Sequence, residues 1–258
     1  MTMARIYYPH ELEAGNLCVV TGENRQYVLS VLRMRQGERI LLFDGKGHEY
    51  EAVIRTQDQA SLTVEVLTKE TINVGSCKIT LAQSLPKGWK MDFIVEKACE
   101  LGVTSIIPFI SSRSVPRLTP EQGRHKQARW QKVALEAARK SHAGGIPEIE
   151  GVLSFNEMLC HAAAETVKII FWEEEKGAHL KQMLQEKNRG QRGDFFLVVG
   201  PEGGFSGEEI DLASSRGFAS VSLGRQILKV ETAALAILSI VQYERGILGT
   251  AGMMKGRL

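Results

Sequence analysis

Residues 198–206 read VVGPEGGFS and follow an apolar run that begins at Phe195. The run predicts a buried strand, and the proline and glycines that follow predict a tight turn. Ser206 is followed three residues later by Glu209, a capping-box spacing that predicts the start of a helix. A buried strand, a glycine-rich turn and a helix N-terminus together place backbone N–H groups where they can face a ligand.

A second stretch, residues 218–233, repeats this arrangement. It reads as a strand over residues 218–223, then Gly224, a short irregular segment and a helix that begins near Glu231. Two such turns at adjacent strand ends would line one crevice. Neither turn has the spacing of a Walker A loop or of a Gly-x-Gly-x-x-Gly dinucleotide fingerprint. The residues alone therefore predict a ligand at a strand end, and they leave simple tight-turn chemistry as the alternative.

The pattern of the chain changes near residue 72. Residues 1–72 read as short strands with a hairpin signal, DGKG, at residues 44–47, and they predict a small β-barrel with a short helix over residues 27–32. Small β-barrels often bind RNA, although the fold alone does not establish this. In residues 73–258 strands alternate with helices, which predicts an α/β domain with a parallel sheet. Its expected strands are residues 78–85, 103–110, 167–172, 195–199 and 218–223.

The last predicted helix extends from Glu231 to about residue 248 and is apolar over most of its circumference. Such a helix is buried in a core or in a subunit interface, so we expect a homodimer. An earlier helix over residues 91–101 ends at Gly102, and another is expected over residues 179–187.

Composition excludes several classes of protein. The four cysteines stand singly and the six histidines form no i, i+4 pair, so neither a metal site nor a disulfide framework is expected. The first residues lack the apolar core of a signal peptide, and the longest apolar run, residues 233–241, is far shorter than a membrane span. We expect a cytoplasmic, metal-free protein with no membrane partner.

Positive charge is concentrated in residues 113–140. This segment carries eight lysines or arginines against two glutamates, whereas the formal net charge of the whole chain is +2. A basic stripe on a nearly neutral protein indicates a face that binds a polyanion. A solvated helix face is the alternative, and composition does not decide between the two.

The two glycine-rich stretches together resemble the ribosomal RNA small subunit methyltransferase E family of the SPOUT superfamily. Further segments agree with that family in order and spacing, and the resemblance covers essentially the whole chain. These segments are residues 31–33 with Gly37, 43–45, Lys87, Lys97 with residues 100–103, 112–114, 129–130, 136–138 and Pro147.

The resemblance implies a PUA-like, RNA-binding β-barrel over residues 1–72. It also implies a SPOUT-type parallel sheet over residues 73–258 whose C-terminal part forms a trefoil knot. Members of the family are homodimers that use S-adenosylmethionine to methylate N3 of a uridine in 16S rRNA, within the small ribosomal subunit. By the same resemblance, the cofactor contacts the two glycine turns and the end of a third strand. The implied cofactor residues are Phe171, Trp172, Val199, Gly200, Pro201, Glu202, Gly203, Gly204, Leu223, Gly224, Gln226, Ile227, Leu228, Glu231 and Ala233.

The resemblance also suggests which residues handle the RNA and the reaction. Catalytic candidates are Glu202, Arg113 and Lys229. Arg113 would hold the uracil oxygens or a flanking phosphate, whereas Lys97 and Glu100 are expected to form a structural ion pair. The RNA-binding candidates are Arg5, Arg33, Arg113, Arg117, Arg129 and Lys140.

Uridine N3–H is a weak acid, so a base or a charge that stabilises the N3 anion must assist the transfer. Glu202 would bind polar groups of the cofactor or accept the N3 proton, and as a base it would need a raised pKa. The chain departs from the family pattern at Tyr27, Lys140, Ala143 and Lys229, and Lys229 keeps the charge of the usual arginine without its bidentate fork. These departures leave two alternatives: a SPOUT methyltransferase for another RNA site, or a non-catalytic RNA-binding homologue.

Overall fold

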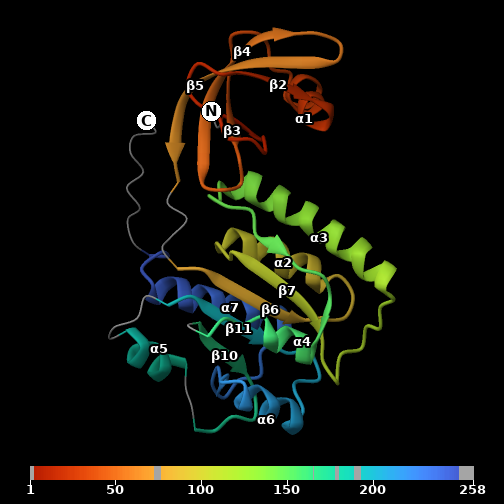
Figure 1. The fold of residues 1–258 in the computed structure, drawn as a ribbon, viewed down its shortest axis with the longest axis vertical. Helices are drawn as coiled ribbons and strands as arrows, with labels where there is room; N and C mark the ends of the chain where they lie inside the picture. Colours follow the sequence, from red (N-terminus) through yellow and green to blue (C-terminus); the bar gives the residue numbers. More distant parts are fainter. Residues whose placement is uncertain (1–2, 73–76, 165, 178–179, 189–192, 250–258) are drawn as a thin grey trace. The chain divides into compact units, whose positions relative to one another are not determined.

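The computed structural model describes residues 3–72, 77–164, 166–177, 180–188 and 193–249, without the side chains of residues 185–188 (Figure 1). Contacts divide the chain into two compact units. The first is Met1–Val74 with Leu135–Ile146, and the second is Gly75–Ala134 with Pro147–Leu258. The predicted domain boundary between residues 72 and 73 lies beside undescribed residues. A single boundary there also does not assign residues 135–146 to the first unit. His179, expected in a helix, and the tail from residue 250 onward also lie outside the described residues.

The first unit is a five-stranded sheet in the order β1-β3-β4-β5-β2 (Figure 1). Strand β1 pairs in parallel with β3 and the other pairs are antiparallel, with two register shifts between β4 and β5 that bend these long strands. The expected hairpin at residues 44–47 is confirmed, and the Asp44 carboxylate accepts backbone N–H bonds from Lys46 and His48. The elements are β1 (Ala4–Tyr7), β2 (Leu17–Thr21), α1 (Gly22–Gln26), the π-helix η1 (Tyr27–Val31), β3 (Arg39–Phe43), β4 (His48–Gln57) and β5 (Ser61–Thr71).

Arg5 is buried in the first unit, with a side chain that is 2% exposed. Its Nε donates to the Glu49 carboxylate at 2.6 Å, and its Nη atoms donate to the backbone carbonyls of Ala138 and Ala143. The guanidinium also lies 3.7 Å from the centre of the Phe43 ring. The prediction that Arg5 binds RNA is therefore wrong, because all of its charge is directed inward to fix residues 138–143 on the sheet.

The second unit is a parallel sheet in the order β12-β10-β11-β6-β7-β8, with the short β9 also paired to β7. All five expected strands are present and every pairing is parallel, as predicted. The elements are β6 (Ile79–Ser84), α2 (Lys90–Glu100), β7 (Ser105–Ile110), α3 (Pro120–Ser141), β8 (Glu148–Ile149), β9 (Leu153–Ser154), α4 (Phe155–Cys160), β10 (Val167–Phe171), α5 (Leu180–Asn188), β11 (Phe195–Val199), α6 (Gly207–Ser215), β12 (Ala219–Val221) and α7 (Val230–Glu244).

Helices cover both faces of this sheet. Phe196 and Val198 of β11 share one core cluster with residues of α4 and α6, so these helices cover one face. The alternate residues of β11 face the other way, and there the centre of the Phe195 ring lies 4.5 Å from the guanidinium of Arg245, the residue that follows α7. Helices α7 and α2 pack on each other. No helix among the described residues is long and apolar enough to cross a membrane.

The buried position of Arg5 gives a stability prediction. Arg5→Met leaves the Glu49 carboxylate buried without this charged partner, so the free energy of unfolding should fall by about 3–5 kcal/mol. Arg39→Met is the matched control, because the Arg39 side chain is 62% exposed in its pair with Glu51 and such pairs contribute about 1 kcal/mol or less. Urea denaturation measures both, and equal losses would contradict the buried role of Arg5.

Candidate functional site

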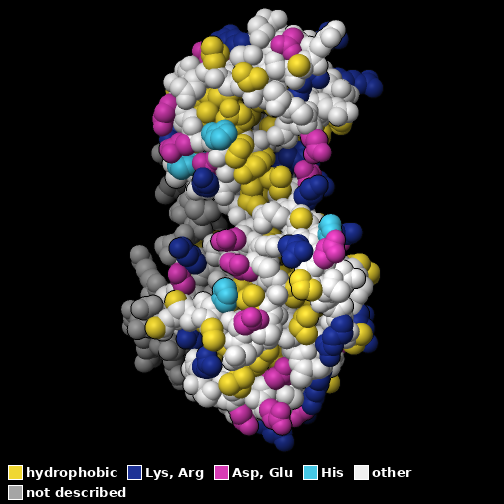
Figure 2. Space-filling view, turned by 45° about the vertical axis from the view of Figure 1, so that its right-hand side comes forward, with side chains coloured by type: hydrophobic (Ala, Val, Ile, Leu, Met, Phe, Trp, Pro, Cys, Tyr) yellow, Lys and Arg dark blue, Asp and Glu magenta, His cyan; other side chains and the backbone are white. Residues whose placement is uncertain are grey.

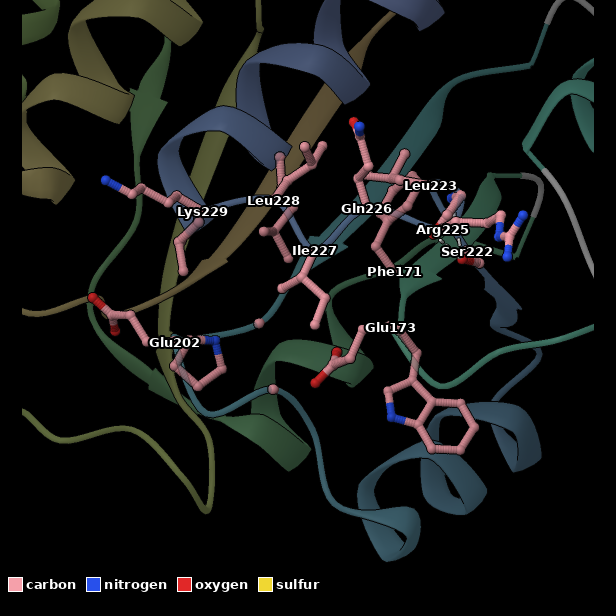
Figure 3. A pocket seen from close by; sticks show the side chains of 18 of the residues that line it. Phe171, Glu173, Glu202, Ser222, Leu223, Arg225, Gln226, Ile227, Leu228 and Lys229 are labelled. Atoms are coloured by element: carbon pink, nitrogen blue, oxygen red, sulfur yellow. Dashed lines mark hydrogen bonds between the residues drawn. The ribbon is translucent and has the colours of Figure 1, made fainter.

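A cavity of about 340 Å³ lies at the carboxyl ends of β10, β11 and β12 (Figure 3). Each strand continues into one wall: residues 171–173 after β10, residues 199–204 after β11, and residues 222–233 after β12. In a parallel sheet these ends lie at one edge, which is where α/β proteins bind ligands. Figure 3 shows Glu202 and Lys229 on one side of the cavity and Arg225 on the other.

The turn after β11 contains glycines because other side chains approach it closely. Gly204 has a φ of +65°, and a Cβ there would lie 1.9 Å from the Glu173 carboxylate oxygen Oε1. A Cβ on Gly200 would lie 3.0 Å from the Phe205 ring, and one on Gly203 would lie 3.2 Å from Cβ of Arg113. These approaches join the turn to the wall after β10 and to the loop after β7.

The capping box at Ser206 and Glu209 is confirmed, and Glu209 has a second role. Its carboxylate also accepts bonds from the backbone N–H of Ser112 at 2.8 Å and from the Ser112 hydroxyl at 2.9 Å. This fixes the loop after β7, so that Nη1 of the neighbouring Arg113 donates to the Gly203 carbonyl at 3.0 Å. Arg113 thus lies beside the turn, as its candidate role requires.

Glu202 takes part in a cluster of charges that the sequence did not reveal. The Lys90 ammonium lies 2.7 Å from Oε1 of Glu202 and 3.7 Å from Oε2 of Glu231. Oε1 of Glu202 also accepts the backbone N–H of Lys87 at 3.2 Å. Burial acts to raise the pKa of the Glu202 carboxyl, but the bonds from Lys90 and the backbone outweigh burial and lower that pKa. The condition set for Glu202 as a general base, a raised pKa, is not met.

The segment after β12 exposes backbone donors. Gly224 N–H donates to the Ser222 hydroxyl at 3.2 Å, whereas the N–H groups of residues 225–229 donate to no other described residue. The indole Nε1 of Trp172, buried in the opposite wall, also has no hydrogen-bond partner among the described residues. Ile227, in the same segment, is 88% exposed and lines the cavity. Unpaired donors beside apolar side chains are what a polar ligand with a flat aromatic part requires.

Comparison with known proteins identifies the fold and the family. Residues 74–242 match a family profile described as an RNA methyltransferase domain, and residues 20–67 match one described as an RNA methyltransferase PUA domain. The chain is 30% identical to the ribosomal RNA small subunit methyltransferase E of Bacillus subtilis, an alignment that covers 92% of this chain and 94% of that protein. The chain belongs to the ribosomal RNA small subunit methyltransferase E family.

Two solved structures are similar to this chain in fold as well as in sequence. The chain is 33% identical to the family member of Neisseria gonorrhoeae bound to S-adenosylmethionine, with a TM-score of 0.84 over 94% of this chain and 98% of that one. It is also 33% identical to a Legionella pneumophila protein described as a methyltransferase with the cofactor bound, with a TM-score of 0.82 and the same coverage. Both of these proteins were crystallised with S-adenosylmethionine bound.

The residues of this chain fit that cofactor. The N–H groups of residues 225–229, which donate to no other described residue, suit the acceptor nitrogens of an adenine ring. Phe171, Val199 and Leu228 provide apolar walls, and Glu173 and Arg225 provide charges for an amino-acid moiety. The donors and the apolar walls belong to one cavity.

Most predicted cofactor residues lie together at the cavity. Those that line it are Phe171, Trp172, Val199, Gly200, Pro201, Glu202, Gly204, Leu223, Gly224, Gln226, Ile227, Leu228 and Ala233. Gly203 turns toward Arg113 instead, and Glu231 faces Lys90. Lys229, a catalytic candidate, also lines the cavity.

The sequence prediction missed five lining residues: Lys90, Glu173, Ser222, Arg225 and Val230. Ser222, Arg225 and Val230 lie within or beside the second glycine-rich stretch, so a prediction of the whole segment would have included them. Glu173 follows the predicted strand that ends at Trp172. No sequence signal separated Lys90 from the other lysines of its segment.

Some basic side chains of residues 113–140 are exposed, whereas others are paired with acidic groups or packed on a ring. Arg124, Lys126, Lys132 and Lys140 are exposed on α3, whereas Arg129 is paired with Asp92, and Arg139 bonds Glu136 and lies over the Tyr27 ring. Arg117 and Arg33 are also exposed. On the face shown in Figure 2, cationic and acidic side chains alternate and do not gather in one patch. The expected structural pair of Lys97 and Glu100 is confirmed at 2.7 Å.

The close approach at Gly204 gives a direct test of the cavity. Gly204→Ala forces a left-handed conformation that costs roughly 1–2 kcal/mol, and its methyl group displaces the Glu173 carboxylate. The strain is present with and without ligand and lowers stability, whereas the displaced Glu173 alters the cavity itself. We therefore expect S-adenosylmethionine affinity, measured by calorimetry, to fall about tenfold, which corresponds to about 1.4 kcal/mol. Gly207→Ala is the matched control, because nothing lies within 4 Å of a Cβ there. Equal affinities in the two variants would contradict a role for the Gly204 turn and Glu173 in binding the cofactor.

Proposed function

We propose that the protein transfers a methyl group from S-adenosylmethionine to N3 of a uridine in 16S rRNA of the small ribosomal subunit. The observation that carries this is the cavity built from two glycine turns, with Arg113, Lys90 and Lys229 at its edge, in a member of this family. We further propose that residues 1–72 act as a PUA-like RNA-binding barrel, and that residues 73–258 form a SPOUT domain whose C-terminal part is a trefoil knot. The family membership and the PUA profile match support both.

The chain's cations favour the reactive form of the substrate. Deprotonated uracil carries its negative charge on N3 and the two flanking oxygens, so ammonium and guanidinium groups near those oxygens lower the pKa of N3–H. Lys90 and Lys229 line the cavity, and Arg113 is fixed beside its glycine turn. The hydrogen bond to Glu202 raises the pKa of Lys90, which keeps that side chain charged.

When bound, S-adenosylmethionine supplies a methyl group on a sulfonium, whose C–S bond breaks as the N3–C bond forms. The N3 proton leaves before or during the transfer, so the sum is one methylated uridine, one thioether and one proton. The apolar walls of Phe171, Val199 and Leu228 hold water away from a step in which opposite charges cancel. Because the pKa of Glu202 is lowered, we assign Glu202 to holding Lys90 and cofactor polar groups and not to accepting the proton.

We propose that the active protein is a homodimer. An apolar hollow of about 560 Å³ lies between α5 and the outer face of α7, and Leu180, Leu184, Ile240 and Tyr243 line it. Tyr243 is 65% exposed and Ile240 is 40% exposed, which is a large apolar surface for α7 to leave in water. Light scattering of the intact protein measures the mass directly, and a monomer would contradict this part of the proposal.

The product of the reaction tests the main proposal. Small ribosomal subunits and free 16S rRNA are each incubated with labelled S-adenosylmethionine, and the modified nucleoside is identified by mass spectrometry. We expect label in N3-methyluridine. Label in another nucleoside favours a different RNA site, and tight RNA binding without label favours a non-catalytic homologue.

Lys90 and Lys97 form a matched pair on α2, since both are lysines in ion pairs with glutamates. Lys90→Met removes the bond that lowers the pKa of Glu202, while burial still raises that pKa. Glu202 then protonates at a higher pH, so the acidic limb of the kcat profile should move upward. We also expect kcat to fall by about 10²-fold, as for loss of a preorganised donor.

Two further variants of α2 separate charge from structure. Lys90→Arg keeps a cation between Glu202 and Glu231 and should leave the acidic limb near its original pH. Lys97→Met should change neither kcat nor the profile. An unshifted acidic limb in Lys90→Met would remove the cluster from the mechanism.

The exposed cations of α3 predict a salt-dependent affinity for RNA. With six or more phosphate contacts, affinity should fall about 10³-fold or more between roughly 50 and 200 mM salt. Arg124 and Lys132 are exposed and have no ion-pair partner among the described residues. The double variant Arg124→Ala, Lys132→Ala should lower the slope of log affinity against log salt by about 2. Lys78→Ala, an exposed lysine just before the amino end of β6 and not on α3, should leave the slope unchanged.

A further inference from the structure

Trp89 is a large aromatic side chain that the second unit leaves 67% exposed. It lies in the loop between β6 and α2 and is the residue immediately before Lys90, the first residue of α2. Trp130, by contrast, is 2% exposed and donates its indole N–H to Asp92. Because Lys90 lines the cavity, the exposed ring of Trp89 lies on the segment next to the candidate site.

The chain holds Trp89 at the edge of the cavity from both sides. Lys87 N–H and the Lys90 ammonium both bond Oε1 of Glu202, at 3.2 and 2.7 Å, and Glu202 belongs to the glycine turn. Trp89 lies between these two anchors. Its ring meets the Phe93 ring at 5.8 Å with an interplanar angle of 85°, an edge-to-face contact that leaves most of the indole in solvent.

Three basic residues lie on the segment that carries Trp89 or on segments bonded to it. Lys87 is exposed, and Arg113 lies beside Gly203, the residue next to Glu202 in the same turn. Arg129 is held near α2 by its ion pair with Asp92, whose backbone N–H bonds the Trp89 carbonyl at 3.1 Å. An exposed indole on a segment that also carries basic side chains is the combination by which proteins bind single-stranded RNA: the bases stack on the ring and the cations contact phosphates.

We propose that Trp89 stacks on a nucleobase of the RNA substrate, beside the nucleotide that enters the cavity, and so positions that nucleotide for the reaction. The proposal rests on the proposed function, since it takes the cavity to be the methylation site. Trp89 acts through the RNA strand that it holds and is a positioning residue. Lys87 and Arg113 supply the charges that contact the flanking phosphates.

The first test measures binding of a single-stranded oligouridylate to the full-length protein. Trp89→Ala should weaken binding about tenfold, the effect of losing one stacked base. Trp89→Phe keeps a stacking ring and should bind within about threefold of the original protein. Leu212→Ala removes a partly exposed apolar side chain on α6 and is the control, expected to have no effect. Calorimetry with S-adenosylmethionine should give the same affinity for all variants, which shows that they are folded.

A second RNA separates stacking from charge. An oligonucleotide of the same length with abasic sites keeps the phosphates and removes the rings. The original protein should prefer the base-bearing RNA, and Trp89→Ala should bind the two alike. The emission of Trp89, obtained as the difference between the original protein and Trp89→Phe, should be quenched by the base-bearing RNA alone.

Several outcomes would overturn the proposal: unchanged RNA affinity in Trp89→Ala, or equal binding of the two RNAs by the original protein. A change of oligomeric state in Trp89→Ala with RNA affinity intact would assign Trp89 to a subunit contact and equally overturn it. Because these are binding measurements, they decide the role of Trp89 even if the methylated nucleoside is not N3-methyluridine.

Discussion

The bond between the Lys90 ammonium and the Glu202 carboxylate, 2.7 Å long, joins segments that are 112 residues apart in the chain. Lys90 begins α2, Glu202 lies in the turn after β11, and Glu231, in the first turn of α7, lies on the other side of the same ammonium. Three separate connections of the sheet therefore meet at one cation. The two side chains are 24% and 27% exposed, and each partner has a second contact that restricts its rotamers.

This arrangement explains why the local patterns predicted the sheet better than the site. Each of the five strands carries its own apolar run, and the glycine turns carry their own conformational signal, so short stretches of sequence were sufficient. Strands β8 and β9 have two residues each and no periodicity to detect. Helix α4 was missed although Ser154 and Glu157 form a capping box, a local signal that was available.

The residues that were misassigned depend on partners far away in sequence. Arg5 resembles any other cation of a basic module, but its partners Glu49, Ala138 and Ala143 lie 44, 133 and 138 residues away. Nothing in the local sequence distinguishes Lys90 from the other lysines near it, and only the fold brings Glu202 to it. Glu202 itself was found from its glycines, whereas its protonation state depends on Lys90 and could not be read from them.

The ionised state of Glu202 also affects the field in the cavity. A bare carboxylate beside a sulfonium would stabilise the charged ground state more than a transition state in which charge is being cancelled. Lys90 neutralises much of that field while leaving Glu202 as a hydrogen-bond acceptor. Lys90, Arg225 and Lys229 line the cavity with Glu173 and Glu202, so positive side chains exceed negative ones by one there. In the proposed reaction the attacking uracil is anionic, and a cavity with this small excess of positive charge admits it without a bare carboxylate that would bind the methyl donor too tightly to react.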